Sequence, residues 1–187
     1  MGVKFHFLNV GVGDCTIIHF PEKEIRKDGQ LLKTKEERIT IMDINHHSDQ
    51  EEYEHILDYY KSNPDFRSEN GELKPIFRFI CSHPHQDHIC GLSELLADSE
   101  MKIFNFWDLE HSFTPEDFNH YETHEEDWNA YRTLGGGQNV TVIRTYREDT
   151  QRDFWKDDED RITILSPSKE LIKRAHFNED GIKKRYR

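Results

Sequence analysis

Residues 83–88 read His-Pro-His-Gln-Asp-His, and this stretch decides the fold. Its pattern, H-x-H-x-D-H, packs three imidazoles and one carboxylate into a single short turn. A mostly apolar run at 76–81 precedes the turn, and residues 89–97 follow it with leucines at helical spacing. The turn is therefore expected where a strand ends and a helix begins. Because α/β folds place their chemistry at such strand ends, the sequence predicts an α/β fold with a functional site here.

The spacing of the donor groups in this turn favours metal binding. His83 and His85 alternate in extended geometry and point the same way, whereas Asp87 and His88 enter the helix. Asp87 and His88 then face a second point, about 3.5–4 Å from the first, which is the usual distance between two metals in one site. Imidazole suits zinc, iron and copper, and carboxylate oxygen suits harder ions. The pattern predicts a site for two divalent metals, with zinc, iron or manganese permitted.

The extended stretch 82–92, which fits S-H-P-H-x-D-H-x-x-G-L, resembles the metal-binding signature of the metallo-β-lactamase fold, especially its competence-protein (ComEC-type) branch. Residues 5–20, with the turn N-V-G-V-G-D-C at 9–15, are similar to the opening hairpin of that branch. Residues 39–43 are similar to the strand that ends in an acidic residue supporting the metal site, and residues 162–167 resemble a later strand with its Pro turn. The resemblance implies a metallo-β-lactamase-like αββα sandwich.

The resemblance also implies an activity. Members of this fold are mostly metal-dependent hydrolases, and the ComEC-type branch is associated with phosphodiester chemistry on nucleic acids or nucleotides. By this resemblance His83 and His85 hold one metal, Asp87 and His88 hold the other, and Asp43 orients the cluster from behind. A water whose pKa the metals lower is the nucleophile, and Asp87, the expected catalytic residue, helps to orient it. The expected activity is that of a phosphodiesterase or nuclease-like hydrolase, with zinc as the first choice of metal.

The sequence departs from the family pattern after the signature. The family needs a further His, an acidic residue in a G-D turn that bridges the metals, and a late His, yet no G-D dipeptide follows His88. We therefore expect residues 1–187 to form a single incomplete domain, truncated after its first sheet and flanking helices. The alternatives to a hydrolase are an inactive metal- or partner-binding module, and a protein completed by self-association or by a complementing chain.

The missing ligand of the first metal has several candidates. His111 is the expected ligand because it follows the apolar stretch 103–110, and Asp108 is the nearby alternative. His120 and His124 lie four residues apart in an acidic stretch and are expected to face solvent. His46 and His47 closely follow Asp43, and they are expected to line the rim of the site or to have capping and loop roles.

Alternation and helical spacing outline the remaining elements. Strands are expected at 3–9, 15–20, 39–43, 76–81, 103–110, 140–145 and 162–165, and helices at 49–62, 89–97 and 168–175. The charged stretch 21–38 reads as a long hairpin loop around Asp28 and Gly29. Residues 112–137, acidic and aromatic, are expected to form a helical insertion that covers the site.

Composition narrows the partners and the compartment. The net charge of −12 argues against a broad nucleic-acid-binding face, since that affinity comes from lysine and arginine. A phosphodiester or another small hydrolysable substrate remains compatible, because bound metals supply local positive charge. No stretch approaches a membrane span, and no targeting segment is recognisable. The three cysteines, an odd number in expected buried positions, favour free thiols, with Cys90 in a packing role and the chain in the cytoplasm.

Overall fold

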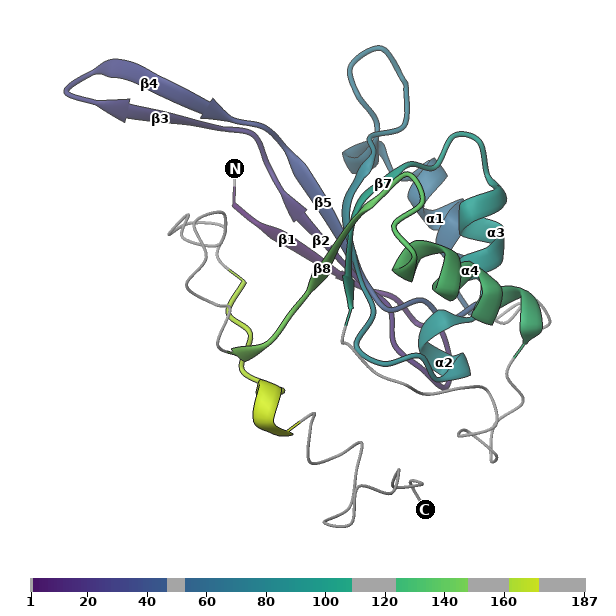
Figure 1. Ribbon diagram of the computed structural model, residues 1–187. Helices are drawn as coiled ribbons and strands as arrows, with labels where there is room; N and C mark the ends of the chain where they lie inside the picture. Colours follow the sequence, from purple (N-terminus) through teal and green to yellow (C-terminus); the bar gives the residue numbers. More distant parts are fainter. Residues whose placement is uncertain (1, 47–52, 109–123, 148–161, 172–187) are drawn as a thin grey trace.

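A computed structural model describes residues 2–46, 53–108, 124–147 and 162–171. A six-stranded sheet runs through its centre in the order β1-β2-β5-β6-β7-β8 (Figure 1). The strands are β1 (Lys4–Phe7), β2 (Thr16–Phe20), β5 (Arg38–Met42), β6 (Ile76–Ile80), β7 (Ile103–Asp108) and β8 (Thr141–Arg144). β1, β2 and β5 pair antiparallel, whereas β5, β6, β7 and β8 pair parallel. The α/β class and these six strands are confirmed.

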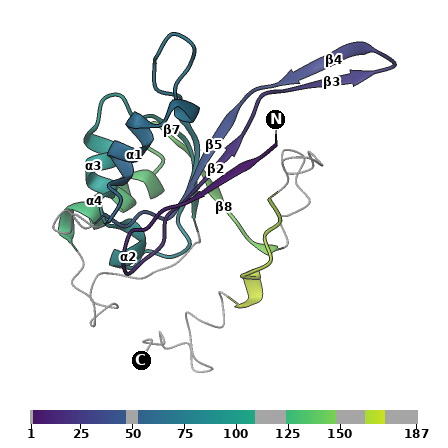
Figure 2. The same ribbon diagram turned by 180° about the vertical axis from the view of Figure 1, so that it is seen from behind.

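A second, two-stranded sheet extends away from the first (Figures 1 and 2). It consists of β3 (Lys23–Lys27) and β4 (Gln30–Lys35), where the sequence led us to expect a long loop. The two turn residues, Asp28 and Gly29, have φ angles of 50° and 80°. Positive φ at both positions is the geometry of the hairpin turn that Asp-Gly favours. The same turn chemistry that marked a loop therefore lets the flanking residues pair as strands.

The helices lie on one face of the sheet. α1 (Ile56–Ser62), α3 (Leu92–Ala97) and α4 (Glu125–Gly135) are on the same side in both views, with the short α2 (Gln86–Ile89) at one end (Figures 1 and 2). A 3-10 turn, Pro64–Phe66, follows α1. Gly91, with φ of 88°, divides the expected helix at 89–97 into α2 and α3. The largest fully buried side chains include Tyr60, Phe66, Phe79, Phe106, Ile17 and Ile41.

The described part of the expected insertion at 112–137 is a core helix rather than a cover for the site. Trp128, Tyr131 and Leu134 recur every three residues along α4 and are buried, so this face packs inward. The Tyr131 ring lies edge-on to Phe106 of β7, with 5.8 Å between ring centroids. Residues 112–123 of the expected insertion lie outside the described residues. The acidic first turn, which suggested an exposed insertion, is only the amino-terminal end of α4.

The expected strand at 162–165 does not form. Leu165 is 77% exposed, and these residues make no ladder with β8, which pairs only with β7 among the described strands. Alternating polarity alone does not make a strand, because a strand also needs ladder hydrogen bonds to a neighbouring strand. The helix expected from 168 does begin there, because Ser168 Oγ accepts a hydrogen bond from Leu171 N at 3.0 Å. Residues 172–175 of that helix lie outside the described residues.

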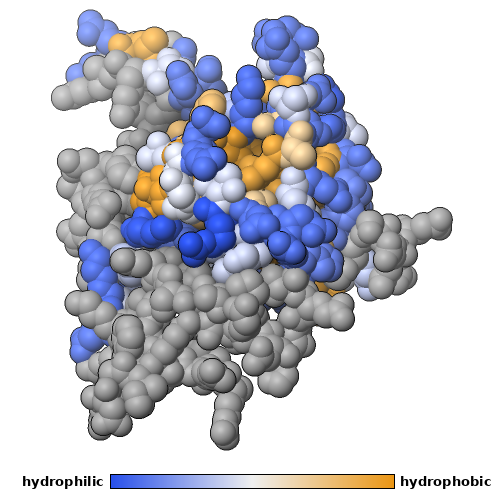
Figure 3. Space-filling view, turned by 45° about the vertical axis from the view of Figure 1, so that its right-hand side comes forward, coloured by the Kyte–Doolittle hydropathy of each residue, from blue (hydrophilic) through white to orange (hydrophobic). Residues whose placement is uncertain are grey.

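The molecular surface agrees with the polar composition. In the space-filling view most of the described surface is hydrophilic, and apolar atoms show mainly near the middle (Figure 3). Within the described ranges no helix is both long and apolar enough to cross a lipid bilayer.

Candidate metal centre

The H-x-H-x-D-H turn lies at the carboxyl ends of the two neighbouring parallel strands β5 and β6. Asp43 follows β5, and its backbone N donates to Ile80 O of β6 at 2.9 Å. Ile44 N then donates to His88 O at 3.0 Å, and Ile44 forms an isolated parallel bridge with Ile89. These bonds join the segment after β5 to α2. Since α2 carries half of the signature, the end of β5 is fixed directly behind it.

Asp43 holds the signature turn through its side chain. The carboxylate is buried and accepts hydrogen bonds from Ser82 N and Ser82 Oγ, each at 2.7 Å. It also lies 3.0 Å from His88 Nδ1. The backbone of Asp43 has φ of 56°, a left-handed conformation that is uncommon outside glycine. This is the place expected for the residue that orients the cluster.

His88 is buried between two carboxylates. Its Nδ1 faces Asp43, and its Nε2 lies 3.6 Å from Asp87 Oδ2. Burial alone lowers the pKa of His88, but the hydrogen bond and charge of Asp43, with the charges of Asp87 and Asp14, outweigh it and raise the pKa above its usual value. A cation at Nε2 is therefore favoured electrostatically, whether that cation is a proton or a metal.

His83 and His85 lie beside His88. The His83 ring centroid is 3.9 Å from that of His88 and 4.6 Å from that of His85. Partial burial in this packed group lowers the pKa of His83, and the neighbouring imidazoles lower it further. Burial also lowers the pKa of His85, although the charge of Asp87 opposes it. Both rings are therefore neutral near pH 7, and a neutral imidazole has the lone pair that a metal needs.

The donor set fits a divalent metal, although the donor atoms are not drawn tightly together. Two groups of three potential ligands in the described residues have donor atoms within 4.8 Å of one another, and neither group includes a signature residue. The His83 side chain reaches the surface at the edge of this group, and its Nδ1 is 3.0 Å from Ser82 Oγ. The four signature residues are therefore neighbours whose donor atoms do not converge on one point, and His111 lies outside the described residues.

Residues at 9–15 also contribute to this region, which the donor pattern did not indicate. Gly13 has φ of +134°, and a Cβ there would lie 2.5 Å from both Asp87 O and Asn45 Nδ2. Asn45 Nδ2 in turn donates to Val10 O at 3.1 Å. The G-x-G-D turn therefore packs directly on the signature, and Asp14 adds its charge to His88. Glycine at alternate positions of this turn was the signal that could have located these contacts.

Several other candidate ligands have structural roles. Both oxygens of Asp108 are engaged, by Tyr131 Oη at 2.8 Å and by Arg144 Nη1 at 2.6 Å, so this buried carboxylate joins α4 to β8. His124, as expected, is exposed. His46 is buried rather than at a rim, because the backbone after β5 continues inward beside α2. His47, His111 and His120 lie outside the described residues.

The cysteines behave as expected for packed, free thiols. Cys15, Cys81 and Cys90 are all unpaired and buried. Burial raises the pKa of each thiol above its usual value. Cys90 Sγ donates to His46 O at 2.8 Å, which fits a packing role beside the signature.

Comparison of the chain with protein-family models, with curated proteins and with solved structures finds no match.

Proposed function

We propose that this chain is a metal-dependent hydrolase of the metallo-β-lactamase type, acting on phosphodiesters. The proposed metal ligands are His83, His85, Asp87 and His88. One observation carries the proposal: Asp43 Oδ2 lies 3.0 Å from Nδ1 of His88, while Nε2 of the same ring faces Asp87. A histidine whose rear nitrogen binds a buried carboxylate is the usual arrangement of a metal-binding histidine.

The Asp43 contact matters because it selects a tautomer. A carboxylate can only accept, so it keeps the proton of a neutral His88 on Nδ1 and leaves the lone pair on Nε2. The two bonds from Ser82 fix the carboxylate itself. His88 is thereby oriented before any ion binds.

The sheet supports the fold part of the proposal. The turn follows parallel strands in the interior of the sheet, and α1, α3 and α4 cover one face (Figure 1). On β1, His6 contacts Phe66 on the helix side, so Phe5 and Phe7 project from the opposite face and are 57% and 79% exposed. An αββα sandwich needs an apolar surface on that second face for its next layer.

In the proposed chemistry, bound ions and protein side chains have separate roles. Divalent ions, when bound, supply positive charge that neutralises a phosphate and activates water. His83 and His85, neutral near pH 7, provide lone pairs toward solvent. Asp87 is half-buried beside His88 Nε2, where its second oxygen can accept a proton from a water. It is the proposed catalytic residue.

The test combines metal content with hydrolysis of bis(p-nitrophenyl) phosphate by the zinc- or manganese-loaded chain. We expect bound metal and turnover in the unaltered chain, and loss of turnover together with at least one metal equivalent in His85→Ala. The exposed His124→Ala variant is the matched control and should change neither quantity. Absence of metal after reconstitution, or unchanged turnover in His85→Ala, would contradict the proposal.

Metal binding without hydrolysis would favour a second candidate, a metal- or partner-binding module. The observation behind it is that the signature brings only four donors together among the described residues. Two ions in a hydrolytic site need more protein ligands than that.

A further inference from the structure

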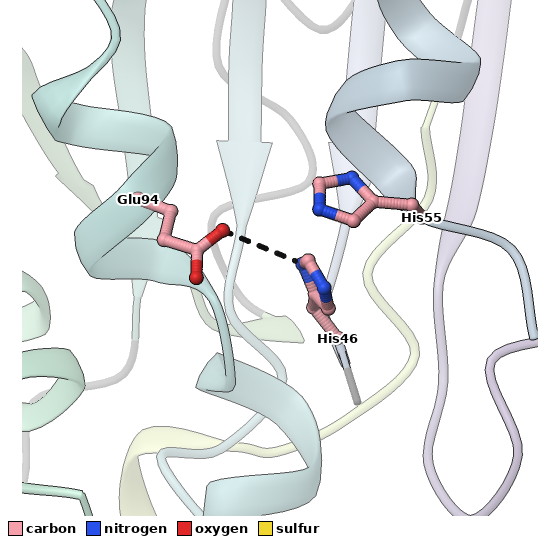
Figure 4. Close-up of side chains that lie close together, drawn as sticks. All are labelled: His46, His55 and Glu94. Carbon is pink, nitrogen blue, oxygen red and sulfur yellow. Dashed lines mark ion pairs between the residues drawn. The ribbon is translucent and has the colours of Figure 1, made fainter. Parts of the chain in front are cut away.

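A second group of potential ligands lies on the helix side of the same strand end. His46 comes from the segment after β5, His55 from the start of α1 and Glu94 from the first turn of α3 (Figure 4). His46 Nδ1 is 3.6 Å from Glu94 Oε2, and the ring centroids of the two histidines are 3.7 Å apart. One donor atom from each residue lies within 4.8 Å of the other two. Three separate segments therefore direct donors at one point.

His46 is held in place by the backbone of the signature helix. Its N donates to Cys90 O at 3.1 Å, and its O accepts from Cys90 Sγ at 2.8 Å. Gly91 passes so close that an added Cβ would lie 2.8 Å from His46 Cβ. The His46 side chain is 95% buried by this packing, its relative exposure being 5%. It is thus a fixed, desolvated donor rather than a surface histidine.

His55 has a partner for its rear nitrogen in either tautomer. As the N-cap of α1, its Nδ1 accepts a hydrogen bond from Asp58 N at 3.3 Å, and Asp58 Oδ2 lies 3.6 Å from the same nitrogen. If Nε2 binds a metal, Nδ1 must carry the proton, and the Asp58 carboxylate can then accept it. Figure 4 shows the His55 ring directed toward His46 and Glu94. Metal binding at Nε2 would therefore replace the cap hydrogen bond from Asp58 N with one from Nδ1 to the Asp58 carboxylate.

We propose that His46, His55 and Glu94 form a zinc site. Two imidazoles and one carboxylate are a donor set that zinc takes with a water in its fourth position. Zinc–ligand distances of about 2.0–2.2 Å place tetrahedral donors about 3.4 Å apart. The donor atoms lie within 4.8 Å of one another, so the widest pair must close by up to about 1.4 Å, and the Glu94 side chain, 55% exposed, has room to move. We call these three residues the zinc clip, since the ion would join the end of β5 to α1 and α3.

Two alternatives to a zinc ion at the clip are supported less well by the contacts of these residues. A simple ion pair of protonated His46 with Glu94 gains little, because the Glu94 carboxylate is solvated, and it gives His55 no role. The other compact group, Cys90, His124 and Asp127, already uses its carboxylate. Asp127 accepts from Gln86 Nε2 at 2.9 Å and from Ser93 N and Oγ at 3.0 and 2.7 Å. A metal there would have to break these buried bonds.

Zinc counting on the full chain tests the clip separately from the signature. Glu94→Gln keeps size at a half-exposed position, and His55→Asn keeps a helix-capping side chain while removing the imidazole. Each variant should lose one tightly bound zinc equivalent, measured by atomic emission after dialysis against zinc-free buffer. The same loss should occur in a His83→Ala, His85→Ala background, where the signature is already removed. Cobalt(II) titration of that background should show the visible absorption of a four-coordinate ion only while the clip is intact.

The matched control is His124→Asn, which makes the same change at the N-cap of α4. It should retain the full zinc count, and a loss there would assign the ion to the Cys90 group instead and overturn the proposal. An unchanged zinc count in Glu94→Gln would also overturn it, and so would a chain that binds no zinc at all. If His55→Asn fails to fold, Glu94→Gln decides alone. Failure of hydrolysis at the signature would leave the clip result unaffected, since the clip requires no turnover.

Discussion

The signature turn and the zinc clip lie at the same end of β5, yet they draw their residues from the sequence in opposite ways. The signature has four donors within six residues, and a single distant residue, Asp43, contacts one of them, His88, from behind. The clip has one donor from each of three segments, and its position depends on a close backbone approach at Gly91. The signature thus supplies several donors of which His88 is held by a distant residue, whereas tertiary packing alone brings the three residues of the clip together.

The largest expected effect comes from removing the charge behind the signature. Asp43→Asn keeps the shape and tolerates positive φ, but it replaces one acceptor oxygen with a donor that faces Ser82 and His88. We expect a loss of about 3 kcal/mol in the free energy of unfolding, measured with urea. Zinc affinity at the signature should fall by about 10–100-fold, because His88 loses its orienting partner. The zinc clip should keep its ion.

Asp28→Asn provides the control for this prediction. Asp28 also has positive φ, at 50°, but it is an exposed turn residue. The stability change there should stay within about 0.5 kcal/mol. Equal effects of the two substitutions would show that Asp43 contributes backbone geometry rather than charge. The signature could then not be described as held by the Asp43 carboxylate.

Much of the fold followed from patterns confined to short stretches. Alternation located six strands of the main sheet, and leucines at helical spacing located α3. The position of Asp43 behind the turn was anticipated through the family resemblance. The predictions that failed depended on pairing with another segment: residues 162–165 alternate but form no strand in the described part of the chain, and residues 21–38 contain two strands because both arms of a hairpin are present.

The zinc clip could not have been predicted for the same reason. His46, His55 and Glu94 are spread over nearly fifty residues and occur among ordinary polar neighbours. Only the parallel approach of the segment after β5 to α2 brings His46 inward, where the sequence suggested a rim or loop. Each of these residues alone has an unremarkable explanation, and the spacing between them contains no periodicity. Tertiary contact is therefore the only signal for such a site.

A smaller effect is expected from filling the close approach at Gly91. Gly91→Ala places a Cβ 2.8 Å from His46 Cβ at φ of +88°, so it combines backbone strain with a clash. We expect a loss of about 2 kcal/mol, with weaker zinc binding at the clip and unchanged binding at the signature. The matched control is Gly71→Ala, where φ is +84° and no atom lies within 4 Å of the added Cβ. It should cost only the strain, about 1 kcal/mol.

The difference between these two glycine variants isolates packing from backbone conformation. If Gly71→Ala destabilises the chain as much as Gly91→Ala, the backbone at Gly91 can move away from His46 at little cost. The position of His46 would then be less constrained by packing than we infer. Thermal or urea unfolding gives the stability difference, and zinc titration of both variants gives the effect on the clip.

The smallest effect is expected at His6, a histidine outside both clusters that serves as their reference. Its Nδ1 lies 2.8 Å from Tyr59 Oη, and burial, opposed by the charge of Asp65, lowers its pKa below the ordinary 6.5. The unfolded chain then binds more protons near pH 6, so the contribution of His6 to stability is complete above pH 6.5 and is lost as the pH falls. His6→Gln keeps a neutral partner for Tyr59 and should reduce the fall in the urea midpoint between about pH 7.5 and about pH 5.5 in metal-free protein. If the urea midpoint of His6→Gln falls with pH as much as that of the unaltered chain, His6 does not contribute to the pH dependence. Any fall that remains in His6→Gln measures protonation of other groups, including those in the two clusters.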